Sequence, residues 1–341
     1  MNRIILNSVA DQIEKKLIHG AVVLAGTPEQ DLFTGVYGTA NPEKGTPMKR
    51  DTIFDIASVT KPVGTNSALL LAVAEGKIDI DKPFTDYLTG FRTALKHPVS
   101  VRMLASHASG VCMDYPKITP PEKMKAALMD IPFPFAPYEQ WQYTCTAFIL
   151  LGLTVEAATG KTIDQLVSEK VFQPLGMTRT RWTKVPEGTL ENTAKMINAD
   201  PGIISDPGAR AFAPYALGNA GLFSTADDLA KFCRMMLKND GSIFPEKILS
   251  LAFTDCNPGH LNSPRSVGWD MRRSGVPGKL SDQTIHHSGW TGQSVWIDPE
   301  NHFFLIVLTN RCGDWTKARD GRICIAEEVL SRINFDMLFP K

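Results

Sequence analysis

The pair Ser58 and Lys61, in the run Ser58-Val59-Thr60-Lys61, is the strongest candidate for chemistry in this sequence. Residues three apart on a helix lie on one face, so we expect the Lys61 amine against the Ser58 hydroxyl. A serine becomes a nucleophile when a base takes its proton, and a lysine serves as that base if burial or a helix N-terminus lowers its pKa from about 10.4. The same N-terminus offers a backbone N–H to an oxyanion. The pair therefore predicts acyl transfer; the plain alternative is an S-x-x-K run, which arises by chance about once in a chain this long.

Motifs for other chemistries do not occur in the sequence. It holds no G-x-S-x-G elbow, no H-E-x-x-H zinc pair, and no dinucleotide-binding or phosphate-binding glycine loop. The six cysteines are scattered without a C-x-x-C pair, and His286 and His287 are adjacent, which sends their rings to opposite faces of a strand. His107 is expected to make local hydrogen bonds at a helix end. We therefore expect neither a metal nor an organic cofactor.

Composition narrows the class of protein further. The chain has 341 residues, 36 of them basic and 36 acidic, so the formal net charge is zero, whereas nucleic-acid binding usually shows a basic excess. The longest apolar runs, such as residues 303–308, are far shorter than the roughly 18–20 residues of a membrane span. The first residues lack the apolar stretch of a signal peptide. We expect a cytoplasmic protein that binds neither nucleic acid nor membrane.

Residue periodicity predicts which elements position the candidate serine. Two strands are expected near each end of the chain, joined as a hairpin by a short turn, at 20–26 and 31–37 and at 294–298 and 302–309. A helix is expected beside each hairpin, at 8–18 and at 318–333. The middle favours helices at 67–75, 146–159, 162–172 and 225–237. No linker divides the chain. We predict an α/β (α+β) fold: an antiparallel sheet built from both termini, flanked by helices.

The domain prediction follows from these elements. Residues 1–341 are expected to form a single domain. An α/β lobe is expected from 1–60 plus 216–341, with a mainly helical lobe from 61–215 inserted in it. The sequence leaves the oligomeric state open.

Fragments spread over almost the whole chain then resemble a known group of proteins. In order, they are Ser58-Val-Thr-Lys61, Leu104-Ala-Ser-His-Ala-Ser-Gly110, Pro137-x-x-x-Trp141-x-Tyr143 with Ala158-Thr-Gly160, Pro174-Leu-Gly-Met177, Ala220-Gly-Leu-Phe-Ser-Thr-Ala-Asp-Asp-Leu229, and His287-Ser-Gly289 with Trp296-Ile-Asp-Pro299. Each fragment alone is weak. Their shared order resembles the serine β-lactamase and penicillin-binding protein superfamily, in its class C β-lactamase and esterase branch. The resemblance implies a β-lactamase/transpeptidase-like fold.

The resemblance also assigns roles to residues. It implies that Tyr143 acts beside Lys61 in moving protons, and that the backbone N–H groups of Ser58 and Trp290 form the oxyanion hole. Gly289 and Trp290 would border the substrate on the strand that carries His287. The aromatic residues Tyr115 and Trp141 would line the cleft, although the plain alternative is that such aromatics pack the helical lobe.

Two positions depart from the family pattern. Cys145 stands where the family's Tyr-x-Asn motif has asparagine, and a thiol is a poor hydrogen-bond donor to a substrate amide. His287 stands where the lactam-directed enzymes have the lysine of Lys-Thr-Gly, which removes a cation at neutral pH and predicts weaker binding of a substrate carboxylate. Cys145 and His287 are therefore candidate substrate contacts that disfavour lactams.

The sequence as a whole predicts a serine hydrolase that works through an acyl-enzyme, with small esters as substrates. The alternatives left open are a class C-type β-lactamase, a D-amino-acid peptidase or transpeptidase, and an acyltransferase. Outside enzymology, the alternative is a catalytically silent binding module of the same fold. The expected partner is a small-molecule ester, lactam or amide.

Overall fold

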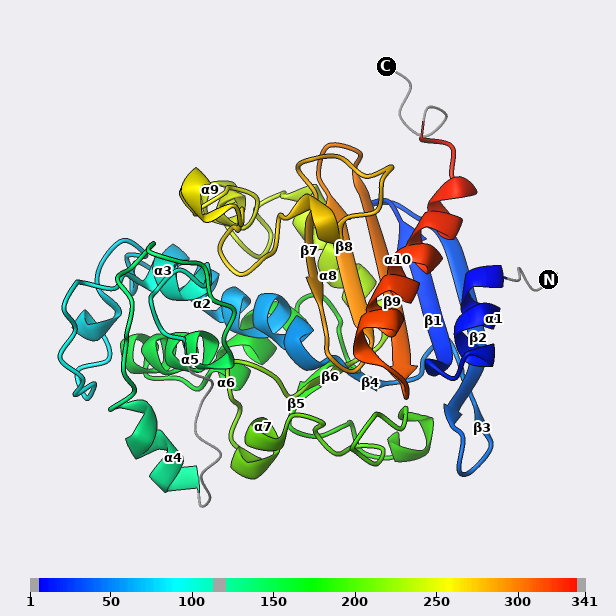
Figure 1. Cartoon of the computed structure of the whole chain (residues 1–341), viewed down its shortest axis with the longest axis horizontal. Coiled ribbons are helices and arrows are strands. Elements are labelled where there is room, and N and C mark those ends of the chain that lie inside the picture. Colours follow the sequence, from blue (N-terminus) through cyan, green and yellow to red (C-terminus); the bar gives the residue numbers. More distant parts are fainter. Residues whose placement is uncertain (1–5, 113–120, 336–341) are drawn as a thin grey trace.

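The computed structural model describes residues 6–112 and 121–335, and it contains a six-stranded antiparallel sheet (Figure 1). The strand order is β3-β2-β1-β9-β8-β7. The strands are β1 (Ile18–Gly26), β2 (Asp31–Asn41), β3 (Thr46–Pro47), β7 (Ile285–Ser288), β8 (Gln293–Asp298) and β9 (Phe303–Arg311). Because β1 pairs with β9, the two ends of the chain meet inside one sheet, which confirms the predicted fold class.

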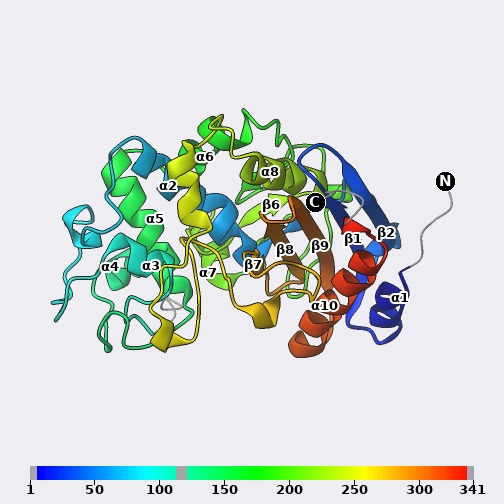
Figure 2. The same ribbon diagram turned by 90° about the horizontal axis from the view of Figure 1, so that it is seen from above.

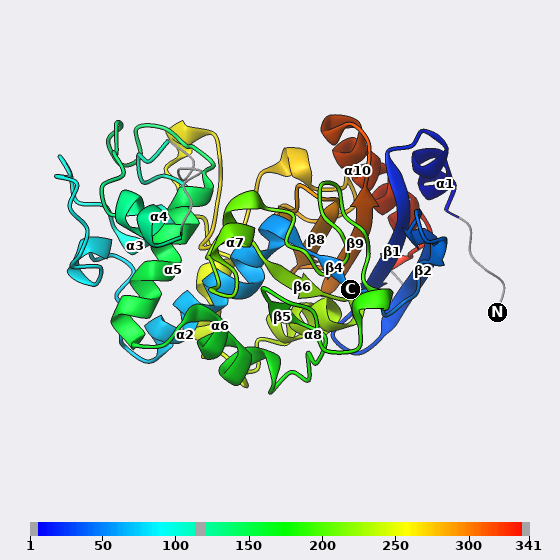
Figure 3. The same ribbon diagram turned by 90° about the horizontal axis from the view of Figure 1, so that it is seen from below.

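Side chains that alternate along the strands bury both faces of this sheet. On β1, Val22 and Leu24 face one apolar core, and Ala21 and Val23 face the other. Helix α8 (Ala226–Lys238) covers the first face, and helices α1 (Asn7–Glu14) and α10 (Trp315–Ser331) cover the second (Figure 2 and Figure 3). The sheet is therefore the middle of three layers.

The terminal helices differ from the predicted ones at two ends. The first helix was expected to reach residue 18, and this is wrong: α1 ends at Glu14, and Ile18 is the first residue of β1. Lys16 has a φ of 54°, a left-handed conformation that ends the helix, so the following apolar residues join the sheet. Helix α10 begins at Trp315, earlier than expected, because the side chain of Asp314 accepts the N–H of Lys317 and caps it.

Helices dominate the middle of the chain (Figure 1). They are α2 (Ser67–Ala74), α3 (Val101–Ala105), α4 (Pro121–Leu128), α5 (Cys145–Thr159), α6 (Ile163–Val167), α7 (Pro207–Phe212) and α9 (Glu246–Leu249). Helix α5 is apolar on all sides and almost wholly buried, and it ends where Gly160 adopts a left-handed φ of 72°. Within the described ranges, no single helix has the length and apolarity of a membrane span. One pair of helical segments, α5 with residues 163–172, has the length and composition of a span only when the two are taken together, and they are bent by 75°. The lobe boundaries at 61 and 215 stay a prediction.

A second, three-stranded sheet supports the candidate serine. Its order is β4 (Phe54–Asp55), β6 (Leu222–Ser224) and β5 (Arg181–Trp182). The hydroxyl of Thr60 accepts the N–H of Leu222 at 3.1 Å, which ties the chain after β4 to β6. This small sheet therefore anchors the segment that carries Ser58.

Candidate active site

Ser58 follows β4 on a strained turn. Ala57, the preceding residue, has a φ of 46°, in the left-handed region that residues other than glycine seldom adopt. The buried carboxylate of Asp55 accepts the N–H of Ala57 at 2.8 Å and the N–H of Ser205 at 2.7 Å. Strain of this kind persists only where the surroundings enforce it. Asp55 therefore holds the turn by tying it to the Ser205 segment.

Ser58 and Lys61 meet as their spacing predicts, although the chain here is not a regular α-helix. Residues 57–59 form a 3-10 turn and residues 61–66 a π-helical turn. The Lys61 Nζ lies 3.1 Å from the Ser58 Oγ and donates to the backbone oxygen of Asn219 at 3.0 Å. The Lys61 side chain is fully buried. The ammonium is therefore held in place against the hydroxyl.

The expected direction of the Lys61 pKa shift is wrong. Burial lowers the pKa of Lys61, but electrostatic interaction with Cys145 and Tyr143, together with a hydrogen bond to Tyr143, raises it by more. The net pKa lies above the usual lysine value. Lys61 is thus a cation in the resting site, and neighbours remote in sequence outweigh the effect of burial.

Tyr143 and Cys145 reach Lys61 from the N-terminus of α5. Thr144, between them, caps the helix by accepting the N–H of Ala147 at 3.3 Å. The Lys61 Nζ lies 5.0 Å from the centre of the Tyr143 ring and 3.7 Å from the Cys145 Sγ. Cys145 contacts the lysine and is not among the residues that line the pocket, so its contact with substrate stays a prediction.

His287 lies in the same pocket as Ser58 and Tyr143, and it comes from the edge strand β7. Its Nδ1 lies 3.1 Å from the carbonyl oxygen of Ser288, and since a carbonyl only accepts, Nδ1 carries the proton. Burial, reinforced by the charges of Lys61 and Arg265, holds the pKa of His287 well below its usual value. The ring is therefore neutral, as expected from the lysine-to-histidine departure.

The turn after β7 brings Trp290 beside Ser58. Arg311 holds this residue, since its Nε donates to the Trp290 carbonyl at 2.8 Å and its guanidinium lies 4.2 Å from the centre of the indole. Among the described residues, no acceptor takes the backbone N–H of Ser58 or of Trp290. Both N–H groups are therefore available to bind an oxyanion.

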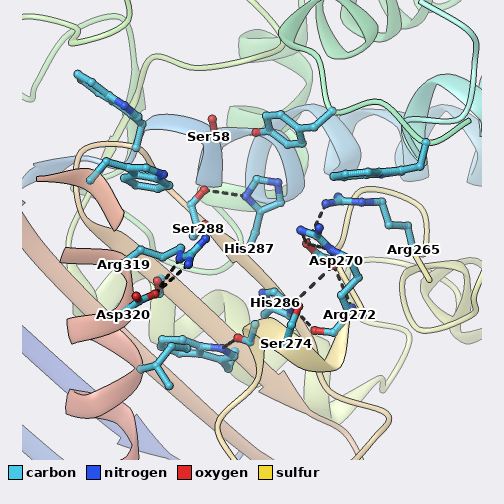
Figure 4. Close-up of a pocket in the computed structure, with 18 residues that line it drawn as sticks. Ser58, Arg265, Asp270, Arg272, Ser274, His286, His287, Ser288, Arg319 and Asp320 are labelled. Carbon is cyan, nitrogen blue, oxygen red and sulfur yellow. Dashed lines mark hydrogen bonds and ion pairs between the residues drawn. The ribbon is translucent and has the colours of Figure 1, made fainter. Parts of the chain in front are cut away.

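These elements enclose a pocket of about 440 Å³ (Figure 4). The predicted site residues that line it are Ser58, Trp141, Tyr143, His287 and Trp290. Lys61 lies buried behind Ser58, and Gly289 packs beneath the turn against Ile56 and Ala57. Tyr115 lies outside the described residues. The pocket thus joins residues from three distant parts of the chain.

Sequence reasoning missed a charged cluster in this pocket, formed by Arg265, Asp270 and Arg272. Figure 4 shows both guanidinium groups directed at Asp270, at 2.8 Å for Arg265 and 2.5 Å for Arg272. Both also lie over the Trp141 ring, at 4.9 and 4.6 Å from its centre. The Arg265 Nε is buried and has no hydrogen-bond partner in the described part of the chain.

Two positive charges therefore share one carboxylate. Burial raises the pKa of Asp270, but Arg265 and Arg272 lower it by more, so Asp270 is ionised. The loss of the family's lysine at position 287 consequently does not leave the pocket without cations, and the expected weakness toward a substrate carboxylate does not follow from it. This charged cluster could not be predicted from the sequence, because an isolated bridge to His286, and not a regular strand, joins Asp270 to the sheet.

Comparison with known proteins agrees with this arrangement. A family model described as Beta-lactamase matches residues 6–327. An N-acetylmuramyl-L-alanine amidase of Bacillus subtilis (strain 168) is 28% identical, with 90% of this chain and 81% of the amidase covered. Esterase EstB of Burkholderia gladioli is 28% identical, with 89% of each chain covered. The solved structure of EstCE1, a hydrolase with promiscuous acyltransferase activity, shares the fold at a TM-score of 0.78 and 21% identity, covering 94% of this chain and 96% of its own.

The family model spans nearly the whole chain, from before β1 to the last turns of α10. Its match includes every described residue of the pocket. This protein therefore belongs to the β-lactamase family of serine hydrolases, within the superfamily of serine β-lactamases and penicillin-binding proteins.

Proposed function

We propose that this protein is an esterase that cleaves small esters through an acyl-enzyme on Ser58. The observation that carries the proposal is the 3.1 Å contact between the Lys61 Nζ and the Ser58 Oγ at the edge of a 440 Å³ pocket. An esterase among the family members with 28% identity supports the choice of substrate class. No described cluster of His, Cys, Asp or Glu suits a metal ion, and the mechanism uses only protein groups.

The proton of Ser58 passes to the pair formed by Lys61 and Tyr143. This pair accepts one proton in either of two forms, amine with phenol or ammonium with phenolate. We assign the second form to this site, in which the Tyr143 oxygen receives the proton and the Lys61 ammonium, whose Nζ lies 5.0 Å from the centre of the Tyr143 ring, stabilises the charge there. The fixed cation therefore makes Tyr143 the proton carrier of the pair.

The bond changes then follow in two steps. The Ser58 Oγ bonds to the ester carbonyl carbon, and the carbonyl electron pair moves to the oxygen, which the N–H groups of Ser58 and Trp290 bind. When the carbon–oxygen double bond re-forms, the alkoxide leaves and takes the proton from Tyr143. A water molecule attacks the acyl group in the same way, with Ser58 as leaving group. The protein thus returns to its starting protonation state.

The charge of the pocket lining favours an ester that carries a negative group. Three arginines and two aspartates line it, namely Arg265, Arg272, Arg319, Asp270 and Asp320. Burial lowers the pKa of both His286 and His287, which also line the pocket, so both are neutral and the lining holds one more positive than negative charge. Among these arginines Arg265 is buried, and its Nε has no hydrogen-bond partner in the described residues, and a buried charged group is costly until its N–H groups and its charge are satisfied. A carboxylate on the substrate would supply the hydrogen-bond acceptor and the opposite charge.

β-Lactam or amide hydrolysis is the second candidate, supported by the family model and by the amidase relative. One experiment separates the candidates: steady-state constants for p-nitrophenyl butyrate and for a chromogenic cephalosporin, with fluorophosphonate labelling. We expect ester turnover, poor lactam turnover because the Cys145 thiol is a weak hydrogen-bond donor to a lactam's amide, and labelling that disappears in Ser58→Ala with the fold retained. A kcat/KM for the cephalosporin equal to that for the ester would favour the lactamase, and an active, unlabelled wild type would overturn the mechanism.

A further inference from the structure

We propose that His107 is a positioning residue for Tyr143. Its backbone oxygen accepts the N–H of Gln142 at 3.0 Å, and its ring Nδ1 accepts the N–H of Thr144 at 3.4 Å. These hydrogen bonds fall on the two residues that flank Tyr143. One histidine thus holds the main chain on both sides of the tyrosine. The proposal rests on the proposed role of Tyr143 in proton transfer.

The imidazole also supports the tyrosine ring. The centres of the His107 and Tyr143 rings lie 4.5 Å apart at an angle of 35°, and Phe148 packs on His107 at 5.0 Å. The Lys61 Nζ lies 5.0 Å from the centre of the same Tyr143 ring. The tyrosine ring therefore lies beside both its proposed catalytic partner and the imidazole of His107.

The contacts of His107 require one protonation state. Since a backbone N–H donates to Nδ1, that nitrogen carries no proton, and the ring proton lies on Nε2. The Nε2 is buried and has no hydrogen-bond partner in the described ranges. Burial, with the nearby charges of Arg265 and Lys61, keeps the pKa of His107 well below its usual value. The ring therefore stays a neutral acceptor toward Thr144.

Two features of His107 are unfavourable for a residue that only fills space. Its φ of 59° is left-handed, and its buried Nε2–H is unsatisfied. Unfavourable local geometry that the surroundings enforce clusters at functional sites. An apolar aromatic residue would pack against Tyr143 without the unsatisfied N–H. Such a residue would lack the acceptor for the N–H of Thr144, and this hydrogen bond is the side-chain contact that holds the main chain beside Tyr143.

Two substitutions separate positioning from packing. His107→Phe keeps an aromatic ring and removes the acceptor, whereas His107→Asn tolerates a left-handed φ and places an oxygen near the site of Nδ1. With p-nitrophenyl butyrate, we expect His107→Phe to lower kcat by about 10- to 100-fold with little change in KM. His107→Asn should restore most of the loss, and His97→Phe, at an exposed histidine, serves as the control.

Double substitution tests whether the effect acts through Tyr143. In a Tyr143→Phe background, His107→Phe should cost nothing further, because the group that it positions is already gone. Equal fold-losses in both backgrounds would overturn the proposal. If Tyr143→Phe itself kept full activity, the proton-transfer role in the proposed function would be wrong, independently of His107.

A measurement without turnover then decides the positioning. With 3-fluorotyrosine incorporated, the fluorine signal missing from Tyr143→Phe is assigned to residue 143. We expect this signal to shift in folded His107→Phe and to return toward the wild-type position in His107→Asn. A signal that stays unchanged in all His107 variants would show that His107 does not position Tyr143.

Discussion

Gly289 and Ala57 lie so close that a β-carbon on Gly289 would stand 3.2 Å from the β-carbon of Ala57. The same atom would lie 2.8 Å from the carbonyl oxygen of Ile56 and 2.5 Å from the Gln293 Oε1. The turn after β7 therefore touches the turn that carries Ser58, because glycine has no side chain between them. This contact sets the spacing between the N–H groups of Ser58 and Trp290.

Gly289→Ala should therefore separate the two candidate oxyanion donors. Loss of one such donor typically costs about 100- to 1000-fold in kcat, and we expect a partial displacement to cost about 10- to 100-fold. The control is Gly90→Ala, where nothing lies within 4 Å of an added β-carbon. Steady-state kinetics on an aryl ester check the prediction, and a folded Gly289→Ala protein with wild-type kcat would contradict it.

Lys61 and Tyr143 should behave as one unit. Lys61→Met and Tyr143→Phe should each lower kcat/KM by about 10²- to 10⁴-fold, the usual range for general acid–base catalysis. Because the Lys61 cation stabilises charge on Tyr143, the double variant should be little worse than the poorer single variant. Losses that multiply in the double variant would instead show two independent roles.

Arg272 should select for charged esters. Arg272→Gln should lower kcat/KM for mono-p-nitrophenyl glutarate by about 10- to 100-fold, since a hydrogen bond to a charged group is worth about 1.5–3 kcal/mol. Turnover of p-nitrophenyl valerate, a neutral ester of the same acyl length, should change little. Arg273→Gln is the matched control, because Arg273 does not line the pocket. Equal losses on both esters would contradict charge selection.

Buried neutral histidines should make the fold sensitive to acid. Burial holds the pKa values of His107 and His287 well below 6.5 in the folded protein. Below pH 6.5 the unfolded chain therefore binds more protons than the folded protein, so the free energy of unfolding falls as the pH falls. Between pH 7 and pH 5.5, each histidine should account for a loss of about 1 kcal/mol.

Urea unfolding at the two pH values measures this dependence. His107→Asn should reduce the loss of stability on acidification by about 1 kcal/mol more than the control His97→Asn, at an exposed histidine, does. A His107→Asn protein with the wild-type pH dependence would show that His107 is not neutral in the folded state.

The sequence by itself determined the features that depend on short-range spacing. Ser58 and Lys61 meet because a spacing of three residues is about one turn of a 3-10 or α-helix, and the chain at residues 57–59 forms a 3-10 turn. The strands that pair across the chain, β1 with β9, followed from apolar runs between turn residues at each end. The end of α1 did not follow from the sequence, because Lys16 ends that helix by a backbone conformation that the apolar pattern does not encode.

Only the tertiary structure decided the electrostatics of the site. The pKa of Lys61 rises because Cys145 and Tyr143, more than eighty positions away, outweigh burial, and no local pattern shows that balance. Arg265 and Arg272 enter the pocket because Asp270 bridges to His286 at the edge of the sheet, and a loop without periodicity gives no sign of this contact. Charge–charge energies depend on distance in space and on burial, which are properties of the folded chain.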